Sequence, residues 1–497
     1  MKHFSFLFLF INALIFAQAN VAYDASFGSN GRLFTTNPAQ YTYNVGFGTV
    51  QYKTIQNIDN KLISVSGNAS ISRYNLNGTL DTAFANSGTR VVMTVSNFNI
   101  SDLANLSDGS ILVLVNNSTK SYIYKYSANG TPDTTFGNGG VLELFVTTYQ
   151  NRFDYIKVLP NDSILIEGSA RVNTTSQGIM GVIKIDKNGN YDTSFSLDGK
   201  VTLSSTTNSY TISLGIDTDS ANNIYVGFES TPNGTFNYYG NVQKLSPNGT
   251  TVTSFGNNGI ASQYVSVDST DMRVFPNGKV LIAATSNTNG SNDAYLVAFS
   301  PAGTLEGTFR YDIDNGSNDN IEKIVIVDNN TFFLTGYTVT GGIGYGLVLK
   351  FNSNFALDTT FNNSGIFTTY YFSNKNSSNY DLILQKDRKL LLTGAGVGAG
   401  NTTNSNIGMI RLIDTKLLAT NEIKKINNIS IYPNPASNVI NLQTDKSLVG
   451  KAYDIVDMTG KSVIKNKLSD KEINVSNLTT GNYILKIDNE SYKFIKK

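Results

Sequence analysis

The sequence contains no cysteine and no tryptophan, and its single histidine is His3. A chain without cysteine has no disulfide, no thiol nucleophile and no thiolate zinc site. His3 lies in an apolar leader that we expect to be removed, so the mature chain would also lack an imidazole base and any Ser-His-Asp triad. Chemistry in this protein would have to rely on carboxylates, Lys, Arg, Tyr or hydroxyl groups.

Proline and charge are also scarce. The chain has 9 Pro, 15% charged residues and a formal net charge of +1, against about 25% charged residues in a typical globular domain. Without a basic excess, nucleic acid is disfavoured as a partner, because phosphate binding needs a positive surface. The 43 Gly and the 11% aromatic residues favour strands and turns over helices.

Residues 1–19 have the pattern of a signal peptide. Lys2 supplies the positive start, a short apolar stretch follows, and the run Ala-Gln-Ala ends at Ala19. Cleavage would leave Asn20 as the first mature residue, with cleavage after Ala17 as the alternative. The apolar stretch is shorter than the roughly 20 residues that a membrane-spanning helix needs. We therefore predict export through the periplasm, with no transmembrane segment after removal of the signal.

One short motif, in which an acidic residue usually precedes Phe by three positions, recurs along the chain. The seven Phe residues follow one another at intervals of 52 to 60 residues, and a Gly usually follows each of them. They are Phe27, Phe84, Phe136, Phe195, Phe255, Phe309 and Phe361. Between successive motifs lie four short strand-like runs separated by Asn/Asp and Gly turns, which suit tight hairpins.

Four short strands per repeat are typical of a β-propeller blade. The seven repeats therefore predict an all-β chain with a seven-bladed β-propeller over residues 20–416. The N-terminal strand at Arg32–Phe34 would complete the last sheet beside Met409–Leu412. The alternatives are a β-solenoid, whose coils are usually shorter, at about 20–30 residues, and a string of sandwiches, each of which needs about 100 residues.

The repeat resembles the delta-60 repeat family, in which a cation and Tyr precede the turn and an Asp-x-x-Phe motif follows it. The best matches run from Arg73 to Phe84 and from Lys125 to Gly137, and the resemblance covers about residues 22–415. Ala298 and Val252 depart from the pattern. The resemblance implies a propeller-like fold of exported bacterial proteins and no defined activity.

A cation recurs at one position of the repeat, in Arg73, Lys125, Lys184, Lys244, Lys350 and Arg411. A ring of cations could bind an anion. Because the motif Asp recurs with the cation, an ion pair within the blade is the favoured interpretation. The recurring Phe is interpreted in the same way, as core filling between blades.

The composition changes after residue 416. Residues 417–428 read as a polar linker, and residues 429–497 alternate apolar and polar residues as expected for a small Ig-like β-sandwich. Three motifs follow in order: Tyr432, Pro433, Asn434 and Pro435; then Asp457, Gly460 and Lys461; then Gly481 and Tyr483. This trio resembles the type A C-terminal sorting domain of the type IX secretion system of Bacteroidetes.

That resemblance implies that the module is an export address. It predicts the type IX secretion machinery as a partner and a secreted or outer-membrane cell-surface location. The alternative is an ordinary sandwich with a binding role.

A metal site is predicted in one acidic segment. Asp312, Asp314 and Asp319 offer oxygen ligands of the kind that Ca²⁺ prefers, although they do not keep the EF-hand spacing. Asp217 and Asp219 are a similar pair at an expected hairpin. The alternative for both is a solvated turn, and no other cofactor is predicted, because phosphate-binding and dinucleotide fingerprints are absent.

The loops of varying length should gather on one face, where recognition is commonly located. They are residues 170–178, 229–239, 285–293 and 395–406, and Tyr238, Tyr239 and Tyr345 could offer stacking surfaces for sugars. The alternative is that these loops are neutral and simply face solvent. The leading hypothesis is a surface or extracellular binding and adhesion module for a glycan or a protein. The alternatives are a glycan-active enzyme that uses carboxylates or Tyr, for which no catalytic residue is nominated, and a structural surface component.

Overall fold

The computed structural model describes residues 20–497 with internal gaps. The gaps are 35–52, 68–69, 94–97, 118, 174–177, 204–207, 233–236, 266–268, 289, 315, 372–375, 398–404, 420–429, 444–447, 449, 459–460 and 488–489. The predicted signal peptide, with Ala19, and the motif residue Gly460 lie outside the described residues. The chain divides into two compact units, Met1–Leu418 and Ala419–Lys497.

The first unit contains seven antiparallel sheets among its described residues, and we number them along the chain. Sheet 1 consists of β3 (Thr54–Gln56), β4 (Leu62–Gly67), β5 (Ser70–Tyr74) and β6 (Thr89–Val91). Sheet 2 consists of β7 (Asn99–Asn105), β8 (Ile111–Asn116), β9 (Ser121–Tyr126) and β10 (Val141–Leu144). Sheet 3 consists of β11 (Gln150–Val158), β12 (Ile164–Arg171), β13 (Ile179–Ile185) and β14 (Lys200–Leu203).

The next three sheets repeat this order. Sheet 4 consists of β15 (Asn208–Thr218), β16 (Ile224–Pro232), β17 (Tyr238–Leu245) and β18 (Ile260–Val265). Sheet 5 consists of β19 (Ser269–Val274), β20 (Val280–Thr288), β21 (Ser291–Phe299) and β22 (Leu305–Tyr311). Sheet 6 consists of β23 (Asn318–Ile326), β24 (Thr331–Thr340), β25 (Ile343–Asn352) and β26 (Ile366–Thr369).

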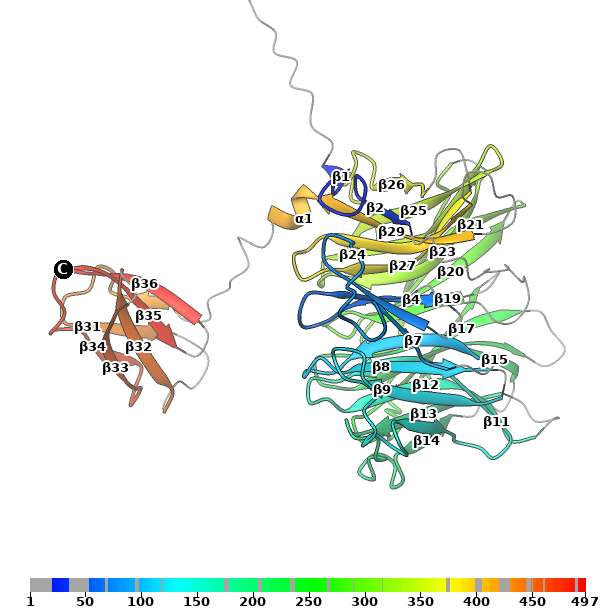
Figure 1. Ribbon diagram of the computed structural model, residues 1–497, viewed down its shortest axis with the longest axis horizontal. Helices are drawn as coiled ribbons and strands as arrows, with labels where there is room; N and C mark the ends of the chain where they lie inside the picture. The colour runs from blue at the N-terminus through cyan, green and yellow to red at the C-terminus, as the bar shows by residue number, and fades with distance from the viewer. Residues whose placement is uncertain are drawn as a thin grey trace, which may run out of the picture. The chain divides into compact units, whose positions relative to one another are not determined.

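Sheet 7 joins the two ends of the first unit. It consists of β27 (Ser377–Leu384), β28 (Leu390–Val397) and β29 (Ser405–Asp414), with the N-terminal strands β1 (Val21–Tyr23) and β2 (Arg32–Phe34) both paired to β29. Arg32 lies opposite Ile410, so the N-terminal strand occupies the outer position expected from the sequence. Figure 1 shows β1 and β2, in blue, beside β29. Such pairing leaves β29 without a free edge.

The first strands of the sheets lie side by side in a propeller-like ring. Contacts link β3 to β7, β7 to β11, β11 to β15, β15 to β19, β19 to β23, β23 to β27 and β27 back to β3. We call these seven strands the inner strands. Each sheet is built outward from its inner strand by tight turns, as at Asn60 (φ 60°), Asn222 (φ 61°) and Gly109 (φ 85°).

Except at Phe309, which lies within β22, the strand after each Phe motif belongs to the preceding sheet. The sequence placed it at the start of a new unit, but β10 pairs with β9 and its first residue Val141 lies opposite Tyr124. The motif is therefore the crossover between the third and outer strands of one sheet. Its Phe is held against the following sheet.

A contact that we call the motif clasp joins neighbouring sheets through this crossover. The side chain of Phe84 is fully buried against Gly130 of sheet 2, where a Cβ would come within 2.8 Å of the ring. Gly130 has a φ of 84°, a conformation that glycine adopts without strain. The amide of Ala85 donates to the carbonyl of Asn129 at 2.9 Å.

The recurring cation completes the clasp. The Nε atom of Arg73 lies 2.8 Å from Oδ2 of Asp81, its guanidinium lies 4.8 Å from the centroid of Phe84, and Nη1 donates to the carbonyl of Ala128 in sheet 2. The corresponding pairs are Lys125–Asp133 at 3.1 Å, Lys184–Asp192 at 3.0 Å, Lys350–Asp358 at 3.3 Å and Arg411–Asp24 at 2.8 Å. The ion-pair interpretation therefore fits five sheets.

Two sheets depart from the clasp where the sequence departs from the motif. In sheet 4, Val252 replaces the motif Asp, and Lys244 pairs with Asp219 at 3.5 Å instead. In sheet 5, Ala298 replaces the cation, and Phe309 is only partly buried because it lies within β22 opposite Leu296. Its ring lies 4.6 Å from that of buried Phe355, which adopts a φ of 61°. Six of the motif Phe residues fill the core as expected, and Phe309 shares this role with Phe355.

The first unit ends at Leu418, within the helix α1 (Thr415–Ala419). Leu417, which the sequence assigned to the linker, is buried in the core of sheet 7 with Phe361 and Leu412. The ordered chain thus continues slightly past the expected end at residue 416. No described helix is long and apolar enough to cross a membrane.

The second unit contains two sheets among its described residues. One consists of β30 (Ser430–Tyr432), β31 (Val439–Gln443) and β34 (Glu472–Asn474). The other has the order β33-β32-β35-β36, with β32 (Ala452–Asp457), β33 (Ser462–Lys467), β35 (Gly481–Ile487) and β36 (Glu490–Lys496). Ile440 and Ile473 of the first sheet share one core with Leu485 and Phe494 of the second.

Candidate functional site

The inner strands carry charged side chains that form a network which we call the axial belt. Lys53, beside β3, pairs with Asp102 of β7 at 3.1 Å. Lys157 of β11 pairs with Asp217 of β15 at 2.6 Å. Asp271 of β19 pairs with Arg273 at 3.0 Å and with Lys323 of β23 at 3.7 Å. These ion pairs therefore cross three junctions between neighbouring inner strands: β3–β7, β11–β15 and β19–β23.

Four aspartates of the belt also hold the backbone of the next sheet. Oδ2 of Asp102 accepts from the amide of Ile156, that of Asp217 from Val274, and that of Asp271 from Ile324, at 2.8 to 3.1 Å. Oδ2 of Asp381 accepts from the amide of Thr54 at 2.9 Å and so links sheet 7 to sheet 1. Hydrogen bonds between charged and backbone groups are stronger than neutral ones.

Close packing of these charges alters their titration. Burial raises the pKa of Glu322, on β23, to about 7. Burial and the neighbouring Arg273 lower the pKa of Lys323 to about 8. Burial and the nearby Asp271 raise the pKa of Tyr155 well above its ordinary value. A tyrosine that resists deprotonation in this way is unsuited to act as a base.

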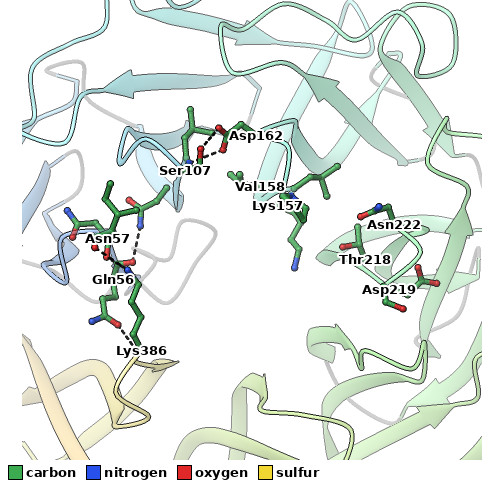
Figure 2. Close-up of a pocket in the computed structure, with 16 residues that line it drawn as sticks. Gln56, Asn57, Ser107, Lys157, Val158, Asp162, Thr218, Asp219, Asn222 and Lys386 are labelled. Atoms are coloured by element: carbon green, nitrogen blue, oxygen red, sulfur yellow. Dashed lines mark hydrogen bonds between the residues drawn. The ribbon is translucent and has the colours of Figure 1, made fainter. Parts of the chain in front are cut away.

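A cavity of about 540 Å³ lies at the turn end of the inner strands. Its lining comes from sheets 7, 1, 2, 3 and 4, and includes Gln56, Asn57, Asn105, Ser107, Lys157, Asp162, Thr218, Asp219, Asn222 and Lys386. Figure 2 shows Lys157 extending between the Ser107 and Asp219 sides. The volume lies within the range of about 300–1,000 Å³ that is usual for small-ligand pockets. We call this cavity the turn-face pocket.

The polar groups of the turn-face pocket are held in place by one another. Nζ of Lys386 donates to the carbonyl of Asn57 at 3.0 Å. The backbone amide of Lys386 donates to Oε1 of Gln56 at 2.8 Å. Both carboxylate oxygens of Asp162 accept from Ser107, at 2.8 and 2.6 Å, as the dashed lines of Figure 2 show. Preorganised amide, ammonium and carboxylate groups of this kind can bind a polar ligand such as a sugar.

Of the two carboxylates that line the pocket, Asp219 is held in its charged form. Burial alone would raise the pKa of Asp219, but hydrogen bonds from Asn223 and Tyr225 and the charge of Lys244 outweigh burial and lower this pKa. A general acid in glycoside hydrolysis needs a raised pKa. Burial strongly raises the pKa of two carboxyls outside the pocket lining, Glu167 and Glu322. Glu167 is fully buried and accepts a hydrogen bond from Ser213, so a substrate cannot reach it.

The structure rearranges the predicted metal ligands. Asp312 and Asp319 lie together with Asp293, and one oxygen of each lies within 4.8 Å of an oxygen of the others. Asp314 is not part of this cluster. Asp217 instead accepts from the amide of Val274 and so joins β15 to β19. Oδ1 of Asp219 accepts from the amide of Asn223 at 2.9 Å and so closes the turn after β15. The cluster of three is considered below.

The loops nominated for recognition lie partly outside the described residues. Tyr239 packs edge to face against Tyr264, with centroids 5.8 Å apart, so part of its ring is already covered. Tyr238 packs against the core of sheets 4 and 5. The turn-face pocket uses none of Tyr238, Tyr239 and Tyr345. It is built by the short turns at the ends of the inner strands, and the sequence analysis missed it.

The motif residues of the second unit shape its edge and turns. Oδ1 of Asn434 accepts from the amide of Ile495 at 2.9 Å, and Ala436 donates to the carbonyl of Ile495, so this segment covers the edge of β36. Pro433 and Pro435 follow cis peptide bonds, and Tyr432 is exposed. Oδ1 of Asp457 accepts from the amide of Lys461 at 3.1 Å and closes the β32–β33 turn. Tyr483 stacks on Phe494, and Gly481 starts its strand.

Two family models match parts of the chain. Residues 430–497 match the secretion system C-terminal sorting domain. Residues 106–136 and 276–309 match a domain of unknown function (DUF5122) that is described as a beta-propeller. The tail of this protein is therefore a type IX sorting domain, which supports a secreted or cell-surface location and export by the type IX machinery. No curated protein matches the chain.

Several solved structures show distant likeness. The polysaccharide lyase Uly1 has a TM-score of 0.41 at 12% identity, covering 79% of this chain and 95% of that one. A K499G mutant of the NanB sialidase of Streptococcus pneumoniae has a TM-score of 0.38 at 10% identity, covering 77% and 71%. A family AA12 carbohydrate-active enzyme of Trichoderma reesei has a TM-score of 0.35 at 12% identity, covering 76% and 98%. These scores are too low for any of the activities to be transferred.

Replacing Glu322 with Gln tests the raised pKa of this half-buried carboxyl on β23. The pKa of Glu322 is about 7 in the folded chain against an ordinary 4.5, so the folded state holds its proton over that range while the unfolded state releases it. Stability should therefore fall as pH rises from 4.5 to 7. Glu322→Gln should raise the free energy of unfolding by about 1–3 kcal/mol at pH 8 and leave it unchanged near pH 4.

Denaturant unfolding across this pH range measures the effect. Glu143→Gln is the matched control, because Glu143 is exposed and pairs with Lys120 at the surface. A Glu322→Gln profile parallel to that of the wild type would show that Glu322 keeps an ordinary pKa in the fold.

Proposed function

We propose that the chain is an exported, non-enzymatic binding module for glycans. In this proposal residues 20–416 form a seven-bladed β-propeller of the delta-60 repeat type, and an Ig-like sorting domain at residues 429–497 directs it through the type IX system. Residues 1–19 act as a signal peptide for the first membrane. The sorting-domain match at 430–497 carries the export part, and the turn-face pocket carries the binding part.

The make-up of the turn-face pocket favours a sugar over a protein as the ligand. The pocket has the size of a small-molecule site, and its walls alternate amides and charges with the apolar side chains of Ile58, Leu106 and Pro160. Sugars offer hydroxyls for the polar groups and C–H faces for the apolar ones. Binding is favoured over hydrolysis because Asp162 and Asp219 are committed to hydrogen bonds within the protein.

Export is tested by removing the sorting domain. Deleting residues 429–497 should leave the first unit in the periplasm, because the address for the outer membrane is lost. Cell fractionation and protease accessibility of whole cells measure the location. Resistance of the retained unit to limited proteolysis controls for misfolding. Unchanged delivery of the truncated chain to the surface would contradict this part of the proposal.

Binding is tested at the turn-face pocket with the chain from residue 20 to 497. Lys157→Gln combined with Asn222→Gly removes an ammonium and an amide from the pocket and keeps the backbone at residue 222, where φ is 61°. Loss of these hydrogen bonds should weaken glycan binding at least about 10-fold. A glycan array followed by calorimetry on the best ligand measures it.

The matched control is Asn60→Gly, which makes the same change at an equivalent turn position (φ 60°); residue 60 is not itself part of the pocket lining. It should keep the wild-type affinity. The proposal is wrong if both variants bind like the wild type. Release of cleaved or unsaturated sugars during the assay would instead identify a glycan-active enzyme.

A further inference from the structure

Three carboxylates meet at the junction of sheets 5 and 6, away from the turn-face pocket. Asp293 lies on β21, Asp312 directly follows β22, and Asp319 lies on β23. One oxygen of each carboxylate lies within 4.8 Å of an oxygen of the other two. Strands from two sheets and the segment between them therefore bring three negative charges together.

Two of the three side chains are fully buried. Asp293 and Asp319 are both 0% exposed, whereas Asp312 is exposed. Asp319 is fixed by protein donors, since its Oδ2 accepts from the amide of Ile313 at 2.9 Å and its Oδ1 from Ser317 at 2.8 Å. Each carboxylate oxygen has two acceptor sites, so both oxygens of Asp319 keep the capacity to bind a cation.

Asp293 carries a buried oxygen that no described residue satisfies. Its Oδ2 accepts from Nε of Arg310 at 2.6 Å and pairs with Nη2 of the same residue. Its Oδ1 is buried and has no hydrogen-bond partner among the described residues. A buried carboxylate oxygen without a partner is costly, and an unsatisfied group in a native fold calls for a water or an ion.

The charge balance points the same way. Arg310 offsets one of the three negative charges, and Asp312 is exposed to solvent beside the buried pair. Carboxylates at this separation repel one another unless a cation lies between them. A divalent cation would neutralise the remaining charges and give Oδ1 of Asp293 a partner.

The geometry points to a divalent cation site at Asp293, Asp312 and Asp319, which takes Ca²⁺ as a hard ion with oxygen ligands. The ion ties the end of β22 and the start of β23 to β21, and so stabilises the junction of sheets 5 and 6. The sequence suggested Asp314 as the third ligand. In this site its place is taken by Asp293, which comes earlier in the sequence. The site is independent of the turn-face pocket and of the export route.

Calcium binding to the chain from residue 20 to 497 tests the site. Calorimetric titration with CaCl₂ after chelator treatment should show one site, with a dissociation constant near the 10⁻⁴–10⁻³ M typical of extracellular modules. Ca²⁺ should also raise the unfolding temperature. Asp312→Asn should weaken binding at least about 10-fold, because it removes the one charged ligand that can be changed without disturbing the core.

Asp314→Asn is the matched control, since it makes the same change in the same exposed segment outside the cluster. It should bind Ca²⁺ like the wild type. Asp293→Asn is a second variant and should abolish binding while its circular dichroism stays that of a folded β protein. Failure of the wild type to bind Ca²⁺ at about 10 mM would show that the site does not exist. Equal Ca²⁺ affinity of Asp312→Asn and Asp314→Asn would show the same.

Discussion

The first unit depends on a clasp in which one cation holds two sheets together. The cation pairs with the motif carboxylate of its own sheet, lies over the motif Phe and donates to a backbone carbonyl of the next sheet, as Lys125 does to Lys187 at 3.0 Å. A cation held by a carboxylate, a ring face and a carbonyl is fully compensated although it is buried. Repetition of the clasp sets the spacing between sheets, and that spacing allows the ring of inner strands to form.

The clasp and the axial belt act on different parts of the same sheets. The clasp joins outer crossovers to the next sheet, whereas Asp102, Asp217, Asp271 and Asp381 join inner strands through backbone amides. Both devices appear at the junction of sheets 7 and 1, in Arg411–Asp24 and in Asp381–Thr54. The turn-face pocket is a consequence of this arrangement, because five adjacent inner strands must end together to line it.

The repeat made most of the fold predictable. The spacing of the Phe motif and its cation predicted the sheets, the ion pairs and the role of Arg32–Phe34 as the closing outer strand, since each is a local pattern copied along the chain. Three motifs were likewise enough to identify the sorting domain. The sequence did not predict that Phe355 shares the core position of Phe309. The contact depends on a φ of 61° at Phe355 in the neighbouring sheet, which no sequence pattern marks.

The candidate sites were harder to predict than the fold, for a physical reason. Lys157, Asp219 and Lys386 come from three sheets, and no repeat position marks them as neighbours. Asp312 and Asp319 were recognisable because they share a short acidic segment, whereas Asp293 joins them only through the packing of β21 against the next sheet. The nominated loops lie at the other ends of the hairpins, so loop length alone did not point to the turns that line the pocket.

A double-mutant cycle on Arg411 and Asp24 tests the clasp most directly, because this pair joins the N-terminal segment to the last sheet. Arg411→Met, Asp24→Asn and the double variant are compared by denaturant unfolding of the chain from residue 20 to 497. The account predicts that the double variant loses less stability than the sum of the single variants, by about 1–3 kcal/mol. Additive losses, within about 0.5 kcal/mol, would show that the two residues are neighbours without being coupled, and would contradict the clasp.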